Sequence, residues 1–194
     1  MPSPNAVKEY LEGGIYHIYN KSLEEFRLFK DDDDCIKFLS LLNRYLTKPL
    51  FGVKPAHKIY YEEVILSCFC LMDNHIHLLI KQLGEDVKII AKFMKSLIIS
   101  YTNYYNKKYN HFGSIFQGVY RARKIEDDID LINVSKYIHL NPNPDNPEEA
   151  IKYEYSSAKH YLRNESKSFE FINQDLIMEH FGHSVSRYKK FLLN

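Results

Sequence analysis

Residues 74–80 have the sequence Asn-His-Ile-His-Leu-Leu-Ile, a short run of mostly branched apolar residues that predicts a β-strand. Side chains alternate between the two faces of a strand, so His75 and His77 share one face while Ile76 points to the other, toward a core. Two steps of about 3.3 Å separate the imidazoles by roughly 7 Å, which allows them to share one divalent metal ion. The alternative is a pair of polar side chains on a solvated sheet face.

The segments on either side of this strand predict an α+β fold. Residues 58–71 predict a second strand, joined to the first by a turn at Asp73-Asn74, so that 58–80 forms an antiparallel hairpin. The other predicted elements are a strand over 14–20, a helix after the four aspartates 31–34, a helix over 85–107, a strand over 119–125 and a helix from 127 to about 141. The order β-α-β-β-α-β is that of a ferredoxin-like split βαβ arrangement, an antiparallel sheet with helices on one face.

The remaining segments predict an appended tail. Short helices are expected around 155–162, 173–181 and 184–192, which makes 163–194 a C-terminal helical extension of a domain formed by 1–162. Residues 1–12 are polar and are expected to form a loose arm. The three cysteines include no CxxC pair, which argues against a disulfide framework and a zinc knuckle. No stretch approaches 18 apolar residues, so we expect a cytoplasmic protein without a membrane partner.

Positive charge is concentrated in the middle of a chain whose net charge is only +1. Residues 84–125 carry eight basic against two acidic side chains, a local charge of +6. The basic residues are Lys88, Lys92, Lys95, Lys107, Lys108, Arg121, Arg123 and Lys124. With the tyrosines between them they suit a nucleic acid, whose phosphates attract cations and whose bases stack on aromatic rings. The alternative is a solvated basic face above core tyrosines.

A tyrosine and an asparagine lie near the end of the helix predicted from 127. Tyr137 is on the flank of the apolar stripe, and Asn141, four residues on, lies on the same side of the helix. The helix must end near Asn141, because Pro142 disfavours helical geometry in the residue before it. On spacing alone, Tyr137 is either a functional group or an ordinary packing residue.

Four segments, in this order, resemble motifs of the HUH single-tyrosine transposases, in particular the REP-associated tyrosine transposases. Residues 70–80 resemble the family's CLMPNHVHLL segment, 116–123 its WQGRYKS-type strand, 136–142 its RYIHLNP signature and 155–157 its WSSY segment. The resemblance covers roughly residues 14–162. Two departures are Asp73, where the family usually has proline, and Tyr155, where it usually has tryptophan.

The resemblance implies a ferredoxin-like fold and a role for each motif. It implies that His75 and His77 bind a divalent metal ion, Mg or Mn, with Asn141 as a third, polar ligand. Tyr137 would be the nucleophile. Arg121, Arg123 and the lysines of 85–107 would contact DNA, and residues 1–162 would form the catalytic domain.

The implied activity is metal-dependent nicking and strand transfer on single-stranded or hairpin DNA through a 5′-phosphotyrosine intermediate. An alternative is a domesticated protein that binds hairpin DNA without turnover. A third possibility, a nucleotide hydrolase of the histidine-triad kind, needs another alternating histidine where this chain has Leu79. A monomer and a homodimer both remain open.

Overall fold

The computed structural model describes residues 10–24, 26–51, 56–162 and 169–194. Most of the predicted N-terminal arm lies outside these residues. The strands are β1 (Ile15–Lys21), β2 (Val64–Met72), β3 (His75–Gln82) and β4 (Arg121–Lys124). The helices are α1 (Asp32–Leu46), α2 (Ile89–Tyr109), α3 (Asp128–Leu140), α4 (Pro147–Ala150), α5 (Ala158–Leu162), α6 (Asp175–Met178), the 3-10 turn η1 (Glu179–Phe181) and α7 (Val185–Leu193).

The four strands form one antiparallel sheet in the order β2-β3-β1-β4. β2 and β3 are the predicted hairpin, joined at Asp73-Asn74. β1 lies between β3 and β4, and its Tyr19 pairs with His77 on one side and with Arg121 on the other. This order confirms the α+β, ferredoxin-like prediction and brings the histidine strand beside β1.

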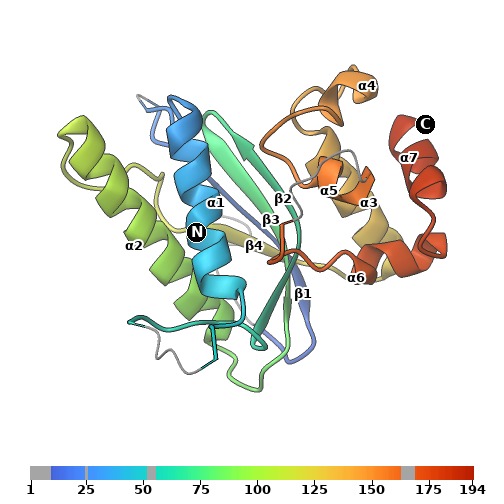
Figure 1. Cartoon of the computed structure of the whole chain (residues 1–194), viewed down its shortest axis with the longest axis horizontal. Coiled ribbons are helices and arrows are strands. Elements are labelled where there is room, and N and C mark those ends of the chain that lie inside the picture. Colours follow the sequence, from blue (N-terminus) through green and yellow to red (C-terminus); the bar gives the residue numbers. More distant parts are fainter. Residues whose placement is uncertain (1–9, 25, 52–55, 163–168) are drawn as a thin grey trace, which may run out of the picture.

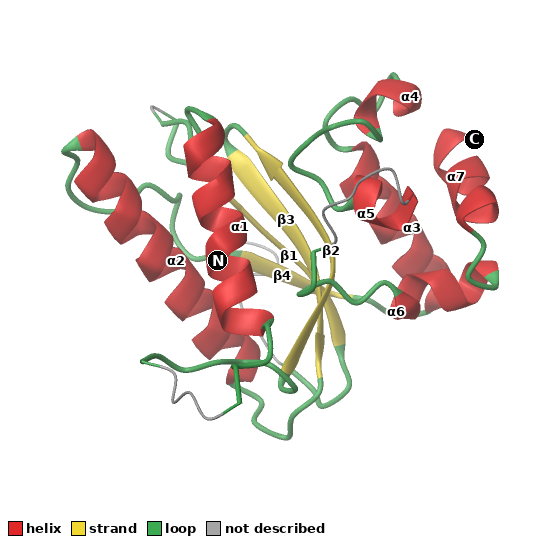
Figure 2. Cartoon of the chain, in the orientation of Figure 1, coloured by secondary structure: helices red, strands yellow, loops and turns green. Residues whose placement is uncertain are grey.

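Helices cover both faces of the sheet (Figures 1 and 2). α1 and α2 pack side by side on one face, and α3 with the C-terminal helices lies on the other. The prediction of helices on one face therefore holds for α1 and α2, while α3 and the tail add a third layer. None of the helices in the described part of the chain is long and apolar enough to cross a membrane.

Several predicted boundaries shift for local reasons. β2 begins at Val64 rather than at 58, because residues 61–63 form a turn that includes Glu62 with a positive φ of 69°. α2 begins at Ile89 rather than at 85, because the Asp86 carboxylate accepts a hydrogen bond from the Lys88 amide and holds a preceding turn. The sequence reading also missed the short helix α4, whose first residue is proline, a favourable residue in a first turn.

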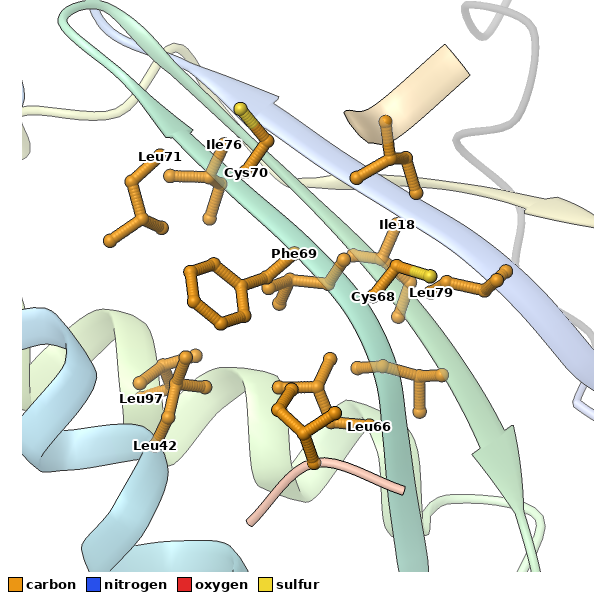
Figure 3. Close-up of a cluster of buried hydrophobic side chains, with 14 of the residues drawn as sticks. Ile18, Leu42, Leu66, Cys68, Phe69, Cys70, Leu71, Ile76, Leu79 and Leu97 are labelled. Atoms are coloured by element: carbon orange, nitrogen blue, oxygen red, sulfur yellow. The ribbon is translucent and has the colours of Figure 1, made fainter. Parts of the chain in front are cut away.

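The core is densest between the hairpin and the helices α1 and α2. In Figure 3 the Phe69 ring of β2 points toward Leu42 of α1 and Leu97 of α2, and all three side chains are fully buried. The thiols of Cys68 and Cys70 point away from these helices. All three cysteines are buried and form no disulfide bond.

The four aspartates begin α1, as their position predicted. Asp31 is the N-cap, and its carboxylate accepts a hydrogen bond from the Asp34 amide. Asp34 is fully buried and forms an ion pair of 2.8 Å with Lys108 at the end of α2. Lys108 also contacts Asp31 at 2.6 Å, so the acidic run ties the start of α1 to the end of α2.

Candidate active site

A pocket of about 770 Å³ opens over one end of β1 and β3. The residues that matter for its chemistry are His75, His77, Tyr137, Lys21, Arg121 and Gln117. β3 and helix α3 therefore bring together His75, His77 and Tyr137, which are up to 62 positions apart in the sequence. Asn141 joins this group through a contact with His75.

His75 lies between two asparagine side chains. Its Nδ1 is 2.7 Å from the Asn74 Oδ1, and its Nε2 is 2.8 Å from the Asn141 Oδ1. Asn141 comes directly after the last residue of α3, so the helix end is the element that places it. Asn141 therefore contacts the histidine strand, and its role as a metal ligand stays a prediction.

His77 is buried and contacts a third histidine that the sequence reading had not singled out. Its Nδ1 is 2.9 Å from the Nε2 of His17 on β1, and the two rings stack with centroids 5.0 Å apart. His17 and His77 are exposed by only 7% and 5%. A signal for His17 existed, because it alternates with apolar residues in β1, the strand that the ferredoxin-like order places beside β3.

Tyr137 is 51% exposed, unlike the side chains of the apolar stripe beside it. Its ring stands nearly perpendicular to the His77 ring at 5.4 Å between centroids and to the His17 ring at 5.8 Å. Its place on the flank of α3, rather than in the core, directs it into the pocket. A solvent-accessible phenol beside a histidine pair can react with a substrate that enters the pocket.

The side chains around His75 fit a divalent cation. A neutral imidazole has one N–H, and with the amides oriented as in the structure both asparagines present oxygen atoms to it. If Asn74 accepts from Nδ1–H, the Nε2 lone pair faces the Asn141 oxygen at 2.8 Å, and a cation in contact with both atoms would satisfy them. Among the described residues no group of three His, Cys, Asp or Glu side chains could hold a metal ion, and the third ligand that the resemblance implies, Asn141, is an amide.

The basic residues of the sequence are distributed over both faces of the sheet. Only Arg121 lines the pocket, together with Lys21, which the sequence reading did not select. The five lysines belong to or immediately precede α2, on the opposite face, where Lys92 pairs with Asp86 and Lys108 with Asp31 and Asp34. Contact of these lysines with DNA stays a prediction.

The two remaining basic residues of β4 also have acidic neighbours. Arg123 makes a bidentate ion pair with Asp130 at 2.8 and 2.9 Å, which ties β4 to the first turn of α3. Lys124 lies 3.7 Å from Glu126 in an exposed pair. Because Arg123 is paired with Asp130, its charge is less available to a phosphate. Contact of Arg123 and Lys124 with DNA stays a prediction.

A buried polar network holds α3, the helix of Tyr137, against the sheet and the tail. His139 is fully buried, with its Nε2 2.7 Å from the Ser157 Oγ and its Nδ1 2.7 Å from the Tyr188 hydroxyl on α7. The Phe69 amide of β2 donates to the Ser157 Oγ at 2.9 Å. The Lys136 ammonium donates to the Phe191 carbonyl at 3.0 Å. These contacts give His139 and Ser157 structural roles that their motifs alone did not indicate.

Lowering the pH from 7 to 5 is expected to reduce the free energy of unfolding. Burial lowers the pKa of His77 to about 3, of His139 to about 3 and of His17 to about 4. In the unfolded chain these imidazoles take up protons at an ordinary pKa near 6.5, whereas in the folded chain they stay neutral at pH 5. The free energy of unfolding is therefore lower at pH 5 than at pH 7, by about 2 kcal/mol per imidazole. Denaturant unfolding at pH 7, 6 and 5 measures this loss.

The matched variant for this pH dependence is His17→Phe. It removes one of the three buried imidazoles and should reduce the loss between pH 7 and pH 5 by about 2 kcal/mol. This window lies above the pH at which carboxylates bind protons, so the aspartate ion pairs contribute little to it. An equal loss in the variant and the wild type would contradict the attribution to buried histidines.

Comparison with known proteins agrees with this geometry. Residues 55–141 match the family model of IS200-like transposases, a range that contains His75, His77, Tyr137 and Asn141. A solved structure of a REP-associated tyrosine transposase bound to a REP hairpin is similar to the chain, with a TM-score of 0.61 and 12% sequence identity, covering 89% of this chain and 92% of that one. No curated protein matches the sequence significantly.

These findings confirm the resemblance that the four motifs indicated. Residues 55–141 are similar in sequence to the IS200-like transposases, and the fold of the chain is similar to that of a REP-associated tyrosine transposase. At 12% identity the structural likeness shows the fold alone. The division of the chain at residues 162 and 163 stays a prediction, since 163–168 lie outside the described residues.

Proposed function

We propose that this protein is a metal-dependent DNA-nicking and strand-transfer enzyme of the HUH single-tyrosine type, acting on single-stranded or hairpin DNA. The observation that carries the proposal is the convergence of Tyr137, His75 and His77 at one pocket, with Asn141 in contact with His75. Packing of the core does not explain the positions of Tyr137 and His75, because Tyr137 is half exposed and His75 is only partly buried. The arrangement of these side chains is therefore better explained by a catalytic role than by a contribution to stability.

In the proposed reaction the Tyr137 phenol oxygen attacks the phosphorus of a DNA phosphodiester. A bond forms between that oxygen and phosphorus and the bond from phosphorus to the 3′ oxygen breaks. The phenol gives up its proton to solvent, and the departing 3′ oxygen takes up one proton from solvent. The products are a 5′-phosphotyrosine and a free 3′-hydroxyl. No energy-rich cofactor is needed for rejoining, because a second 3′-hydroxyl can attack the phosphotyrosine and release Tyr137.

His75, His77 and Asn141 would hold Mg²⁺ or Mn²⁺, which supplies Lewis-acid polarisation of the scissile phosphate when bound. Lys21 and Arg121 at the rim of the pocket would attract the phosphates on either side of the break. An unpaired strand can bend a single phosphate into such a pocket more readily than a duplex can. The similar solved protein is bound to a hairpin, which supports hairpin DNA as the first substrate to test.

The proposed metal site predicts a large effect of His77→Ala on cleavage. Hairpin-bearing single-stranded DNA incubated with Mn²⁺ should form a covalent protein–DNA adduct, visible on a denaturing gel, and EDTA should abolish it. His77→Ala should lower the rate of adduct formation by at least about 10²-fold, because a metal ion contributes several kcal/mol to such transition states. Binding of the hairpin itself, measured by gel shift, should change much less.

The matched control is His180→Ala, which removes an exposed imidazole from the turn η1, outside the pocket. Its rate should equal that of the wild type. A His77→Ala protein as active as the wild type would exclude the metal site. Tight hairpin binding without an adduct in Mg²⁺ or Mn²⁺ would favour the domesticated DNA-binding protein instead.

A further inference from the structure

His17 of β1 is a polar side chain that contacts the proposed metal site without belonging to it. It is almost completely buried, and its Nε2 lies 2.9 Å from the Nδ1 of His77. β1 holds it rigidly, since Tyr16 and Ile18 on either side are core residues and the strand is paired on both edges. A buried imidazole at a fixed position needs a partner, and His77 is the partner that the fold supplies.

The contact between the two histidines can carry only one proton. If His17 donates through Nε2–H, the proton of neutral His77 must sit on its own Nε2, which then has no lone pair for a cation. If His77 donates through Nδ1–H to an unprotonated His17 Nε2, the His77 Nε2 is free to bind one. Only the second arrangement is compatible with His77 as a ligand.

The other ligand histidine has an equivalent partner. The Nδ1 of His75 is 2.7 Å from the side-chain oxygen of Asn74, which can only accept a hydrogen bond. Asn74 therefore selects the His75 tautomer with a bare Nε2. Outer partners of this kind orient metal-binding histidines in proteins generally.

We propose that His17 is a positioning residue that accepts the Nδ1–H of His77 and so keeps the His77 Nε2 unprotonated and directed at the metal ion. The inference rests on the proposed function, because it assumes that His77 is a ligand. His17 acts only through His77 and contacts neither metal nor DNA. The corresponding partner of His75 is Asn74, so each ligand imidazole has its own acceptor.

The test is the affinity of the full-length protein for Mn²⁺ without DNA, measured by electron paramagnetic resonance. His17→Phe keeps the ring but removes the acceptor, and it should weaken Mn²⁺ binding about 10- to 100-fold. His17→Gln offers an amide oxygen and should recover part of the affinity. His180→Ala should bind as the wild type does, and His77→Ala should lose the site.

The outcomes separate this inference from the proposed function. If His77→Ala loses Mn²⁺ while His17→Phe binds it as tightly as the wild type, the positioning role is wrong and the metal site stands. If His77→Ala binds Mn²⁺ as the wild type does, both are wrong. Nitrogen-15 NMR of the metal-free wild type does not depend on the folding of any variant: His77 protonated at Nδ1 supports the inference, and His77 protonated at Nε2 overturns it.

Discussion

Replacing Tyr137 with phenylalanine is expected to abolish the covalent protein–DNA adduct while leaving the fold and hairpin binding intact. The phenol oxygen is the atom that would form the bond to phosphorus. Among the described residues, Tyr19 is the one other tyrosine that lines the pocket. Loss of a nucleophile lowers turnover by about 10³-fold or more. Because the side chain is half exposed, the free energy of unfolding should change by no more than about 0.5 kcal/mol.

Two further variants make this measurement specific. Tyr61→Phe removes the hydroxyl of another exposed tyrosine, on the turn before β2 and outside the pocket, and should form the adduct at the wild-type rate. Tyr19→Phe tests the one neighbour that lines the same pocket. An adduct that persists in Tyr137→Phe and disappears in Tyr19→Phe would identify Tyr19 of β1, and not Tyr137 of α3, as the nucleophile.

Local sequence patterns were sufficient for the elements that carry the site. The alternation around His75 and His77 predicted a strand with both imidazoles on one face, and Pro142 predicted where α3 ends. Once the sheet order is that of a ferredoxin-like fold, β3 must lie in the middle of the sheet, where its ends can support a pocket. The approach of Tyr137 to His77 then follows from the layer in which α3 packs, which no local pattern specifies.

Other features of the site depend on contacts between segments that are far apart in the sequence, and local patterns could not predict them. His17 lies sixty residues before His77 in the sequence. Its contact with His77 follows only from the register of β1 against β3. The lysines of α2 are close to the site in sequence but lie on the other face, because a helix and the strand before it are placed by their apolar stripes. Local charge therefore identified a basic segment, while the packing of α2 decides which of its residues lie near the pocket.

The buried network around His139 predicts the largest loss of stability. His139→Ala should lower the free energy of unfolding by about 3–5 kcal/mol, because it leaves a cavity and removes partners from the Tyr188 hydroxyl and the Ser157 hydroxyl. Tyr188→Phe keeps the ring and removes one hydroxyl, so it should cost only about 1–2 kcal/mol. Denaturant unfolding at pH 7 measures both.

The double variant tests whether the tail supports the tyrosine helix. His139 on α3 and Tyr188 on α7 share a hydrogen bond. The stability loss of the double variant His139→Ala/Tyr188→Phe should therefore be smaller than the sum of the two single losses, by about 0.5–3 kcal/mol. His180→Ala, on the exposed side of the tail, should change stability by no more than about 0.5 kcal/mol. Strict additivity would mean that α7 does not hold α3 through this contact. Coupling would mean that the C-terminal extension fixes the helix from which Tyr137 reaches the pocket, and that α3 is stabilised within its own chain.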